Sequence, residues 1–467
     1  MAAPPKHPGL TAYHLSSANA SPNPSSPKGS QNSLLQSEMK ARVEDQLKDA
    51  SYTVDLTGES GCLRADPRVA QAVFDDLQTT FQALTSGGVS SATDPRLPND
   101  KFLEETASYE PVAHLINKII DTANRHITGS HLRGLRFYPF RQEMNEKYGS
   151  RKPLKPDGVG IMGELPLASG TKKSDLSWEQ VEAAFESKKD VPDMVRQSGT
   201  YARSCIMANQ TRFFALGVGF NYISMDAYIF VFHRAGLSSS PGLDVRKSKG
   251  LKGLVDHVVG ILSLNKANYG LDSTRFQNFF VINNKCYEIV CILHMRGSLR
   301  GRSTTVYSLK GMCMRILSAG LHLSAYPAVD MTPPHDIKSR MLTLSKMDYL
   351  PDKLTYKLTY QIRGRSQEGP LFSQFTGQFG IADVIGYHEC GPEDPHGSTM
   401  RFMNGAKFWN VFGREEGRPD PEPEDRGLHC IALSGEGKAL IDVDNPVGGT
   451  PSPGELLESI LHAIIGK

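Results

Sequence analysis

The stretch Val181-Glu-Ala-Ala-Phe-Glu-Ser-Lys188 decides how the first half of the chain is interpreted. Its apolar start predicts a buried strand, and this strand ends in Glu186-Ser-Lys188. The earlier segment Lys155-Pro-Asp-Gly-Val-Gly160 begins to alternate apolar residues directly after Asp157 and predicts a second strand. Because a loop rich in Gly, Lys and Ser separates the two, we expect neighbouring strands joined by an exposed connection.

Neighbouring strands would place Asp157 close to Glu186, and the two-residue step keeps Lys188 on the same face as Glu186. This is the layout of a PD-(D/E)xK nuclease core, in which two carboxylates hold Mg²⁺ and the lysine orients the attacking water. Asp157, Glu186 and Lys188 are therefore candidate catalytic residues, with Asp157 and Glu186 as Mg²⁺ ligands. The motif is short, so a solvated aspartate beside a strand-end Glu/Lys pair is the simpler interpretation, and a retained fold without activity ranks above an active nuclease.

Composition sets broad limits on the class of protein. A chain of 467 residues predicts two hydrophobic cores. The 52 Lys and Arg residues nearly balance the 50 Asp and Glu residues, so no global field attracts nucleic acid or an anionic membrane. The seven cysteines show no CxxC spacing and predict reduced thiols. With no signal peptide and no apolar run near the roughly 20 residues that cross a bilayer, we expect a soluble intracellular protein, cytoplasmic or nuclear.

The periodicity of apolar residues predicts an α+β chain in four parts. Residues 1–36 form a disordered Ser- and Pro-rich tail, 37–130 a helical lead-in, 131–270 a nuclease-like α/β core, and 271–467 a second, β-rich core. The predicted helices are 37–47, 67–84, 109–127, 197–214, 251–264, one from 366, and 453–465. The predicted strands include 214–222, 228–233, 279–282, 287–293, 354–362 and 429–433.

Three short motifs resemble sequence motifs of nucleotide-binding enzymes but lack the residues or the strand that the chemistry needs. Gly158 to Gly163 matches GxGxxG, but no buried strand precedes it, so we reject a dinucleotide site. His233-Arg-Ala-Gly236 carries alanine where a kinase catalytic loop needs aspartate. Gln378-Phe-Gly380 lacks the metal-binding aspartate of DFG. We interpret all three as structural.

A Gly- and Ser-rich turn, Arg296-Gly-Ser-Leu-Arg-Gly-Arg-Ser303, separates two β-rich runs of the second core. Its backbone N–H groups and its arginine side chains could cover phosphate groups. An exposed hairpin is the equally weighted alternative, because the glycines lack regular spacing.

Taken in order, these segments resemble the fungal-type protein kinase family of mushroom-forming fungi. The resemblance rests on short motifs: Lys155-Pro-Asp-Gly-Val-Gly160, Trp178, Glu186-Ser-Lys188, Gln197, Tyr201-Ala-Arg203, Gln210-Thr-Arg212, His233-Arg-Ala-Gly236 with Ser240, Gly301-Arg-Ser-Thr-Thr-Val-Tyr307, Leu354-Thr-Tyr-Lys-Leu-Thr-Tyr360, and Asp425-Arg-Gly-Leu-His429. The resemblance implies a nuclease-like region followed by a protein-kinase-like small lobe and the start of the large lobe.

For the second core, the resemblance implies an ATP site. Gly301 and Arg302 would belong to the phosphate loop, and Lys357 paired with Glu368 would hold the α- and β-phosphates. Ser303 stands where the family has a second glycine, which stiffens the loop. The structural alternative for Lys357 and Glu368 is an exposed strand lysine and a glutamate that favours a helix start.

The resemblance extends from Glu105 to Lys467 and stops before the catalytic loop and the magnesium ligands. We therefore expect a kinase-family protein that is catalytically incompetent as given, with weak ATP and Mg²⁺ binding, acting as a binding or scaffold module. A protein partner would cover the apolar face left by a missing large lobe. Nucleic acid is expected only under the nuclease alternative, and no membrane partner is expected.

Overall fold

The computed structural model describes residues 36–85, 102–145, 153–165, 173–209, 212–264, 275–276, 279–282, 285–311, 352–365, 368–374, 383–394, 396–414 and 416–434. Residues 1–35 of the predicted tail, the Gln378-Phe-Gly380 motif and the predicted helix 453–465 lie outside these ranges.

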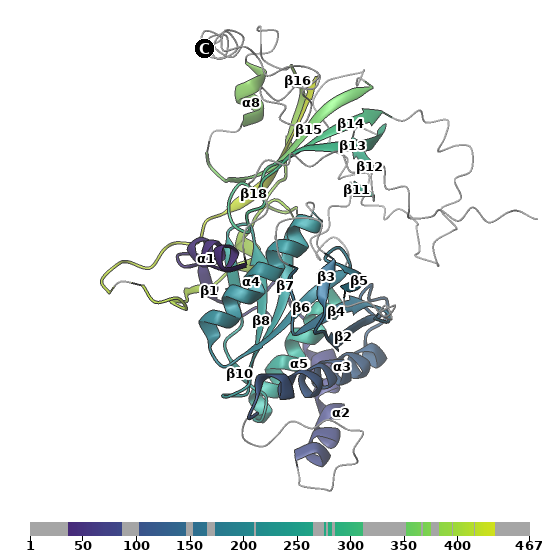
Figure 1. The fold of residues 1–467 in the computed structure, drawn as a ribbon, viewed down its shortest axis with the longest axis vertical. Helices are drawn as coiled ribbons and strands as arrows, with labels where there is room; N and C mark the ends of the chain where they lie inside the picture. Colours follow the sequence, from purple (N-terminus) through teal and green to yellow (C-terminus); the bar gives the residue numbers. More distant parts are fainter. Residues whose placement is uncertain are drawn as a thin grey trace, which may run out of the picture.

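Within the described residues the chain forms two large sheets, in which the strand order differs from the order along the chain, and several helices. This confirms the α+β class (Figure 1). The strands of the first sheet are β1 (Ser51–Thr53), β2 (Leu135–Pro139), β4 (Gly158–Met162), β6 (Val181–Lys188), β7 (Phe214–Asn221), β8 (Asp226–His233), β9 (Gly236–Ser239), β10 (Leu243–Asp244) and β17 (Lys407–Phe408). Their order is β17-β1-β9-β8-β7-β6-β4-β2, with β10 paired to β8. A small separate pair joins β3 (Glu143–Asn145) to β5 (Lys173–Ser177).

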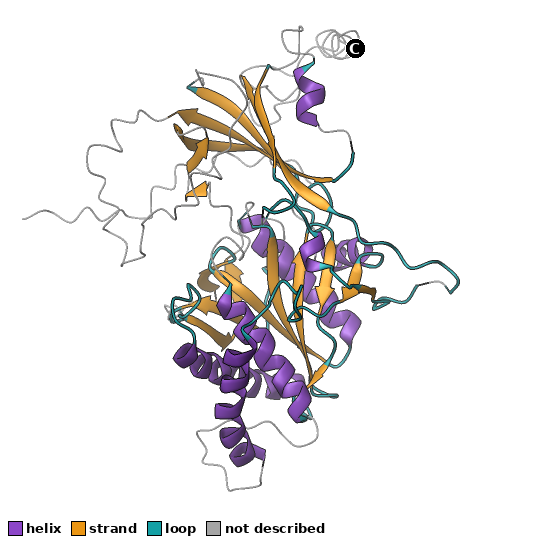
Figure 2. Cartoon of the chain, turned by 180° about the vertical axis from the view of Figure 1, so that it is seen from behind, coloured by secondary structure: helices purple, strands orange, loops and turns teal. Residues whose placement is uncertain are grey.

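Helices cover both faces of the first sheet, as Figures 1 and 2 show. The helices are α1 (Gln36–Leu47), α2 (Pro67–Thr85), α3 (Tyr109–His126), α4 (Val191–Ala208) and α5 (Ser248–Ser263). Alternate residues of β8 enter different cores: Ile229 and Val231 pack with α2, α3 and α5, while Phe230 and Phe232 pack with α1 and α4. The central strands are therefore apolar on both faces, as two-sided burial requires.

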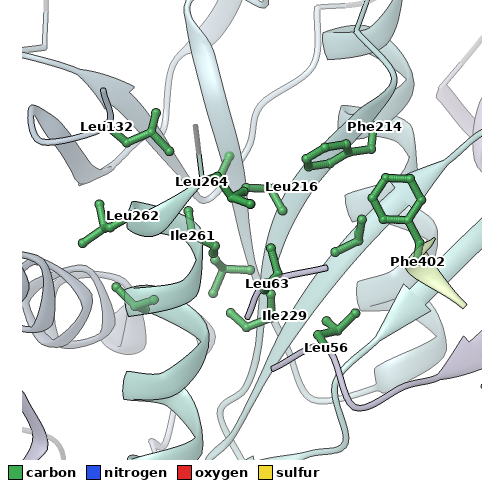
Figure 3. Packing of buried hydrophobic residues seen from close by; sticks show 14 of the residues in the cluster. Leu56, Leu63, Leu132, Phe214, Leu216, Ile229, Ile261, Leu262, Leu264 and Phe402 are labelled. Carbon is green, nitrogen blue, oxygen red and sulfur yellow. The ribbon is translucent and has the colours of Figure 1, made fainter. Parts of the chain in front are cut away.

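The core beneath α5 is continuous with the segment that follows β1. Figure 3 shows Leu216 and Ile229 from the sheet beside Ile261 of α5 and beside Leu56 and Leu63. These side chains are at most 7% exposed. Such burial supplies the main favourable free energy for packing the helices onto the sheet.

The order of elements around β6 brings distant residues together. β2, β4 and β6 pair antiparallel, and β6 then pairs parallel with β7 after the crossover helix α4. The register pairs Gly158 with Phe185. The neighbouring positions Asp157 and Glu186 therefore lie at the same end of the sheet.

The predicted helix 197–214 is displaced toward the C-terminus relative to the observed α4. The helix begins at Val191, with Pro192 in its first turn, and ends at Ala208. Proline favours this place because its missing N–H has no partner in a first turn and its φ is already helical. Phe214 instead begins β7, so the last part of the predicted helix was wrong.

The second sheet has the order β11-β12-β13-β14-β15-β18-β16. Its strands are β11 (Arg275–Phe276), β12 (Phe279–Ile282), β13 (Lys285–Met295), β14 (Thr305–Gly311), β15 (Lys353–Ile362), β16 (Val384–Glu389) and β18 (Arg426–Ser434). A short helix, α8 (Glu368–Ser373), lies between β15 and β16 in the chain. It packs beside this sheet (Figure 1).

The chain returns from the second sheet to the first. Before β18, the strand β17 pairs antiparallel with β1, and the Trp409 amide donates to the Ser51 carbonyl at 2.8 Å. The chain therefore passes from the first sheet to the second after α5, returns to the first sheet at β17, and then enters the second sheet again at β18. None of the helices in the described ranges combines the length and apolar character needed to cross a membrane.

Candidate functional site

The structure brings the three nuclease-like candidates together at one end of β4 and β6. Lys188 Nζ lies 2.6 Å from Glu186 Oε1 and 3.4 Å from Asp157 Oδ2. The Ser187 amide donates to Asp157 Oδ2 at 2.9 Å and fixes that carboxylate beside the strand. The spatial arrangement predicted from the strand order is thus present.

Two further members of this cluster were missed by sequence reasoning. Glu105, in the short 3-10 helix η2 (Glu105–Ser108), accepts a hydrogen bond from Lys188 Nζ at 2.7 Å. The Tyr109 hydroxyl lies 2.6 Å from Asp157 Oδ1 and 2.9 Å from Glu105 Oε1. Their spacing of four residues places both on one side of a helix start, but no local pattern ties that side to a strand about 50 residues later.

The cluster has more carboxylates than cations, and burial disfavours the charged form of these carboxylates. Glu186 is fully buried, and burial raises its pKa to about 8, with the neighbouring Asp157 acting in the same direction and Lys188 opposing it. Burial also raises the pKa of Asp157, against the effect of Lys188. Burial and the bond to Asp157 raise the pKa of Tyr109, so its hydroxyl stays a donor.

The cluster as arranged does not fit a magnesium ion. Mg²⁺ requires several oxygen ligands in near-octahedral geometry. Lys188 Nζ already occupies the place between Glu186 and Asp157 that a metal cation would take. Across the ranges that the structure describes, no three His, Cys, Asp or Glu side chains are disposed around one ion.

The second candidate site lies on the other sheet. Lys357, on β15, forms an ion pair with Glu368, the first residue of α8. Arg302 Nη1 lies 3.5 Å from the other oxygen of the same Glu368 carboxylate. Both Lys357 and Glu368 are about one-fifth exposed, so the pair is accessible from one side. The structure thereby joins three of the four residues predicted for nucleotide binding.

The turn between β13 and β14 contains the fourth, Gly301. Its φ of +108° lies in a region that favours glycine, whereas Ser303, at +40°, adopts a left-handed conformation despite its side chain. The Tyr360 amide donates to the Arg302 carbonyl at 2.7 Å, so this end of the turn is tied to β15. Strain at Ser303 persists because the surrounding bonds hold the turn in place.

Three successive amide groups of this turn already have acceptors. Leu299 N and Arg300 N donate to Gln46 Oε1 at 3.0 and 3.3 Å. Gly301 N donates to the Arg234 carbonyl at 3.0 Å. These amides therefore bond to the first unit of the chain, which is the first sheet with the helices that cover it, rather than pointing into open space.

Two buried arginines of the first unit hold the carbonyl groups of the same turn. Arg203 Nε donates to the Gly297 carbonyl at 2.6 Å, and Arg234 Nη1 donates to the Ser298 carbonyl at 3.1 Å. Arg203 is 2% exposed and Arg234 1% exposed. The Arg234 guanidinium also lies 5.0 Å from the centre of the Tyr360 ring. Sequence reasoning noted both arginines in short motifs but assigned them no contact.

The motifs set aside from the sequence occupy structural positions where they are described. His233-Arg-Ala-Gly236 is the turn between β8 and β9. His233 is fully buried, and burial lowers its pKa to about 3, so its ring is neutral near pH 7. Gly158 to Met162 form β4 rather than a phosphate-binding turn.

One family model matches part of the sequence. Residues 159–314 match the model described as fungal protein kinase. The match begins in β4 and runs past β14, so both sheets contribute to it, and it contains Arg203, Arg234 and the turn that they hold. Lys357 and Glu368 lie outside the match. No curated protein and no solved structure matches the chain. Over the matched residues the chain is similar to the fungal protein kinase family.

Proposed function

We propose that the second sheet and α8 form a kinase-type small lobe that binds the phosphate groups of ATP. The observation that carries the proposal is the ion pair between Lys357 and Glu368. In protein kinases a lysine on the third strand of the small lobe pairs with a glutamate on the following helix, after a phosphate-covering turn between the first two strands. Counted from β13, β15 is the third strand, α8 is the following helix, and residues 296–304 form the turn.

The residues of this site fit the charged end of a nucleotide. Glu368 orients the Lys357 ammonium, which would neutralise the α- and β-phosphates, and Arg302 adds a second cation beside the same carboxylate. ATP, when bound, supplies a transferable phosphoryl group. The chain's own contribution is to bind and orient the phosphates, with Gly301 providing the backbone turn beside them.

We propose further that this chain by itself binds nucleotide without transferring phosphate. The 467 residues contain neither His-Arg-Asp nor Asp-Phe-Gly, and the nearest sequences are His233-Arg-Ala and Gln378-Phe-Gly. Loss of the base that positions the substrate, or of a metal ligand, removes several orders of magnitude of phosphoryl-transfer rate. The role that remains is that of a binding or scaffold module.

Calorimetric titration of ATP, with and without Mg²⁺, tests nucleotide binding. Lys357→Met should weaken ATP binding by about tenfold or more, since it removes a charge-assisted contact to phosphate. Lys353→Met is the matched control, because Lys353 is exposed on the same strand. Equal affinities in the two variants, or no binding at millimolar ATP, would remove the proposal. A radiolabelled γ-phosphate assay should show no transfer to protein by the same chain.

The second candidate function is metal-dependent nuclease activity at Asp157, Glu186 and Lys188. The observation that favours it is the sequence of elements α3, β2, β4, β6, α4 and β7, which gathers these three side chains at one end of the sheet. It ranks second because Lys188 bridges the carboxylates and leaves no open cation position between them. Incubation with plasmid DNA or single-stranded RNA in Mg²⁺ or Mn²⁺ tests it: cleavage lost in Asp157→Asn but kept in Asp193→Asn would establish the activity.

A further inference from the structure

We propose that a cavity beside the β13–β14 turn binds an anion that carries several phosphate groups, and that side chains rather than backbone amides hold it. The cavity has a volume of about 720 Å³. Its walls come from the turn, from the end of β15, from the start of α8 and from the start of β18: Arg296, Arg300, Gly301, Arg302, Gln361, Ile362, Gly364, Arg365, Glu368 and Arg426.

The charge of the cavity lining is strongly positive. Five of its ten residues are arginines, and Glu368 is the only carboxylate in that set. Arg302 and Lys357 share this carboxylate, and Glu424, outside the lining, pairs with Arg300 and Arg426, so Arg296 and Arg365 supply the excess positive charge. Arginine forks bind phosphate oxygens in pairs, which makes a phosphate-rich anion the matching ligand class.

Two donors at the cavity lack a hydrogen-bond acceptor among the described residues. Gln361 is 8% exposed, yet its Nε2 has no partner. Arg300 Nε is likewise buried and without an acceptor, although Arg300 Nη2 lies 3.2 Å from Glu424 Oε1. A buried donor without an acceptor costs about 1–3 kcal/mol. Anion oxygens in the cavity would satisfy both groups.

The amides of Leu299, Arg300 and Gly301 do not serve this role, because residues packed around the first sheet already accept their hydrogen bonds. Gln46 accepts from Leu299 and Arg300, and the Arg234 carbonyl accepts from Gly301. A phosphate cradle made of successive N–H groups would need these amides unbonded. Recognition therefore falls to the guanidinium groups and to Gln361.

The same contacts fix the turn and pre-organise the side chains of Arg300 and Arg426. Arg203 and Arg234 anchor the turn's carbonyl groups, and the Glu424 carboxylate positions Arg300 and Arg426 at 3.2 and 2.6 Å. A turn that is already fixed loses little conformational freedom when a ligand binds. Arg296 and Arg365 are exposed at the cavity, and neither side chain forms a hydrogen bond or ion pair within the described ranges.

The inference does not depend on a bound nucleoside. Lys357 is absent from the cavity lining, whereas Glu368 and Arg302 belong to it, so the cavity adjoins the proposed nucleotide site and shares two residues with it. The ligand chemistry common to both is a group of linked phosphates. Its source is either the triphosphate of a nucleotide or a polyphosphate without a base, and binding experiments separate the two.

Inorganic tripolyphosphate is the probe for a calorimetric titration of the whole chain. The double variant Arg296→Gln, Arg365→Gln should weaken tripolyphosphate binding by about 30-fold, because each change removes a charge-assisted contact. Both side chains are exposed, so the fold should be retained. Arg68→Gln is the control, since its side chain is 92% exposed and does not line the cavity. Gln361→Leu should weaken binding by about fivefold without changing net charge.

Comparison with Lys357→Met identifies the source of the phosphates. Tripolyphosphate binding that is lost in the double arginine variant but kept in Lys357→Met supports a base-free polyphosphate. Binding of both ATP and tripolyphosphate that requires the arginines and Lys357 supports the triphosphate of a nucleotide in the same cavity. Tripolyphosphate that fails to bind, or binds the double variant as well as the Arg68→Gln control, overturns the inference. ATP binding that still depends on Lys357 would then leave the proposed function intact.

Discussion

Arg203 Nε donates a hydrogen bond to the Gly297 carbonyl at 2.6 Å, across 94 residues of sequence. Arg203 lies on α4, which packs against the first sheet, while Gly297 lies in the turn between β13 and β14 of the second. The arginine is 2% exposed and Gly297 is half-buried, so the donor of this bond is shielded from water. The contact therefore joins the two units through the turn that borders both proposed anion sites.

Arg203→Met should lower the free energy of unfolding by about 1–3 kcal/mol, because a charged donor is lost and the half-buried Gly297 carbonyl is left without it. Methionine retains most of the apolar stem, so the effect reports mainly on the guanidinium. Urea unfolding at pH 7 measures the change. Arg68→Met, at an exposed position, should stay within about 0.5 kcal/mol of the parent chain. Equal midpoints for the two variants would contradict the role of the bond.

Gly297→Ala should disturb the same contact from the other side. A Cβ at this position would lie 2.6 Å from Met207 Sδ and 2.8 Å from Arg203 Nη2. Both side chains are nearly fully buried and have little room to move, so we expect a loss of about 1–3 kcal/mol. The double variant Gly297→Ala, Arg203→Ala should lose less free energy of unfolding than the sum of the two single-variant losses. The reason is that the smaller side chain at position 203 makes room for the added methyl group. Strict additivity would show that the two residues are not coupled.

Gln46→Ala should release two amides of the turn. Hydrogen exchange at Leu299 and Arg300 should accelerate by about tenfold, since both donate to Gln46 Oε1. The Gly301 amide serves as an internal control because its acceptor is the Arg234 carbonyl. Gln46→Glu keeps an acceptor oxygen at the same place and should preserve the protection. Unchanged exchange in Gln46→Ala would show that other bonds hold the turn.

Local patterns predicted most of the strands and the pairing that matters at the nuclease-like cluster. Apart from Glu182, the stretch Val181 to Phe185 is apolar on both faces, which marks a central strand, and the strand end then fixes where Glu186 and Lys188 lie. The same reasoning placed Lys357 on β15. Helix boundaries were less accurate at α4, because polar residues are frequent throughout the helix and the polar run Asn209 to Arg212 does not by itself mark its end before β7.

Contacts between the two units could not be predicted in the same way. The bonds from Arg203 and Arg234 to the β13–β14 turn span 94 and 64 residues. Their donors sit in segments whose sequence shows only a buried helix and a hairpin. The five cavity arginines come from three separate segments, and only those of the turn lie close together in the sequence. Such a cavity exists only after the sheet has placed β15 between β14 and β18.

The pH dependence of stability should depend on Glu186. Its pKa in the folded chain is raised from 4.5 to about 8, chiefly by burial. The folded state therefore holds this proton more tightly than the unfolded state, and the associated stability is complete below pH 4.5 and lost as the pH rises through about 8. The raised pKa of Asp157 acts in the same direction, so the parent chain should become less stable from pH 5 to 9.

Glu186→Gln has no proton to lose at this position and should flatten the dependence of stability on pH, by up to about 1.4 kcal/mol for each pKa unit removed. Urea unfolding across this range gives the two profiles, with Glu182→Gln, a neighbour on β6, as the control. Parallel profiles for the parent chain and Glu186→Gln would show that the Glu186 carboxyl is already ionised in the folded state and that Lys188 outweighs its burial.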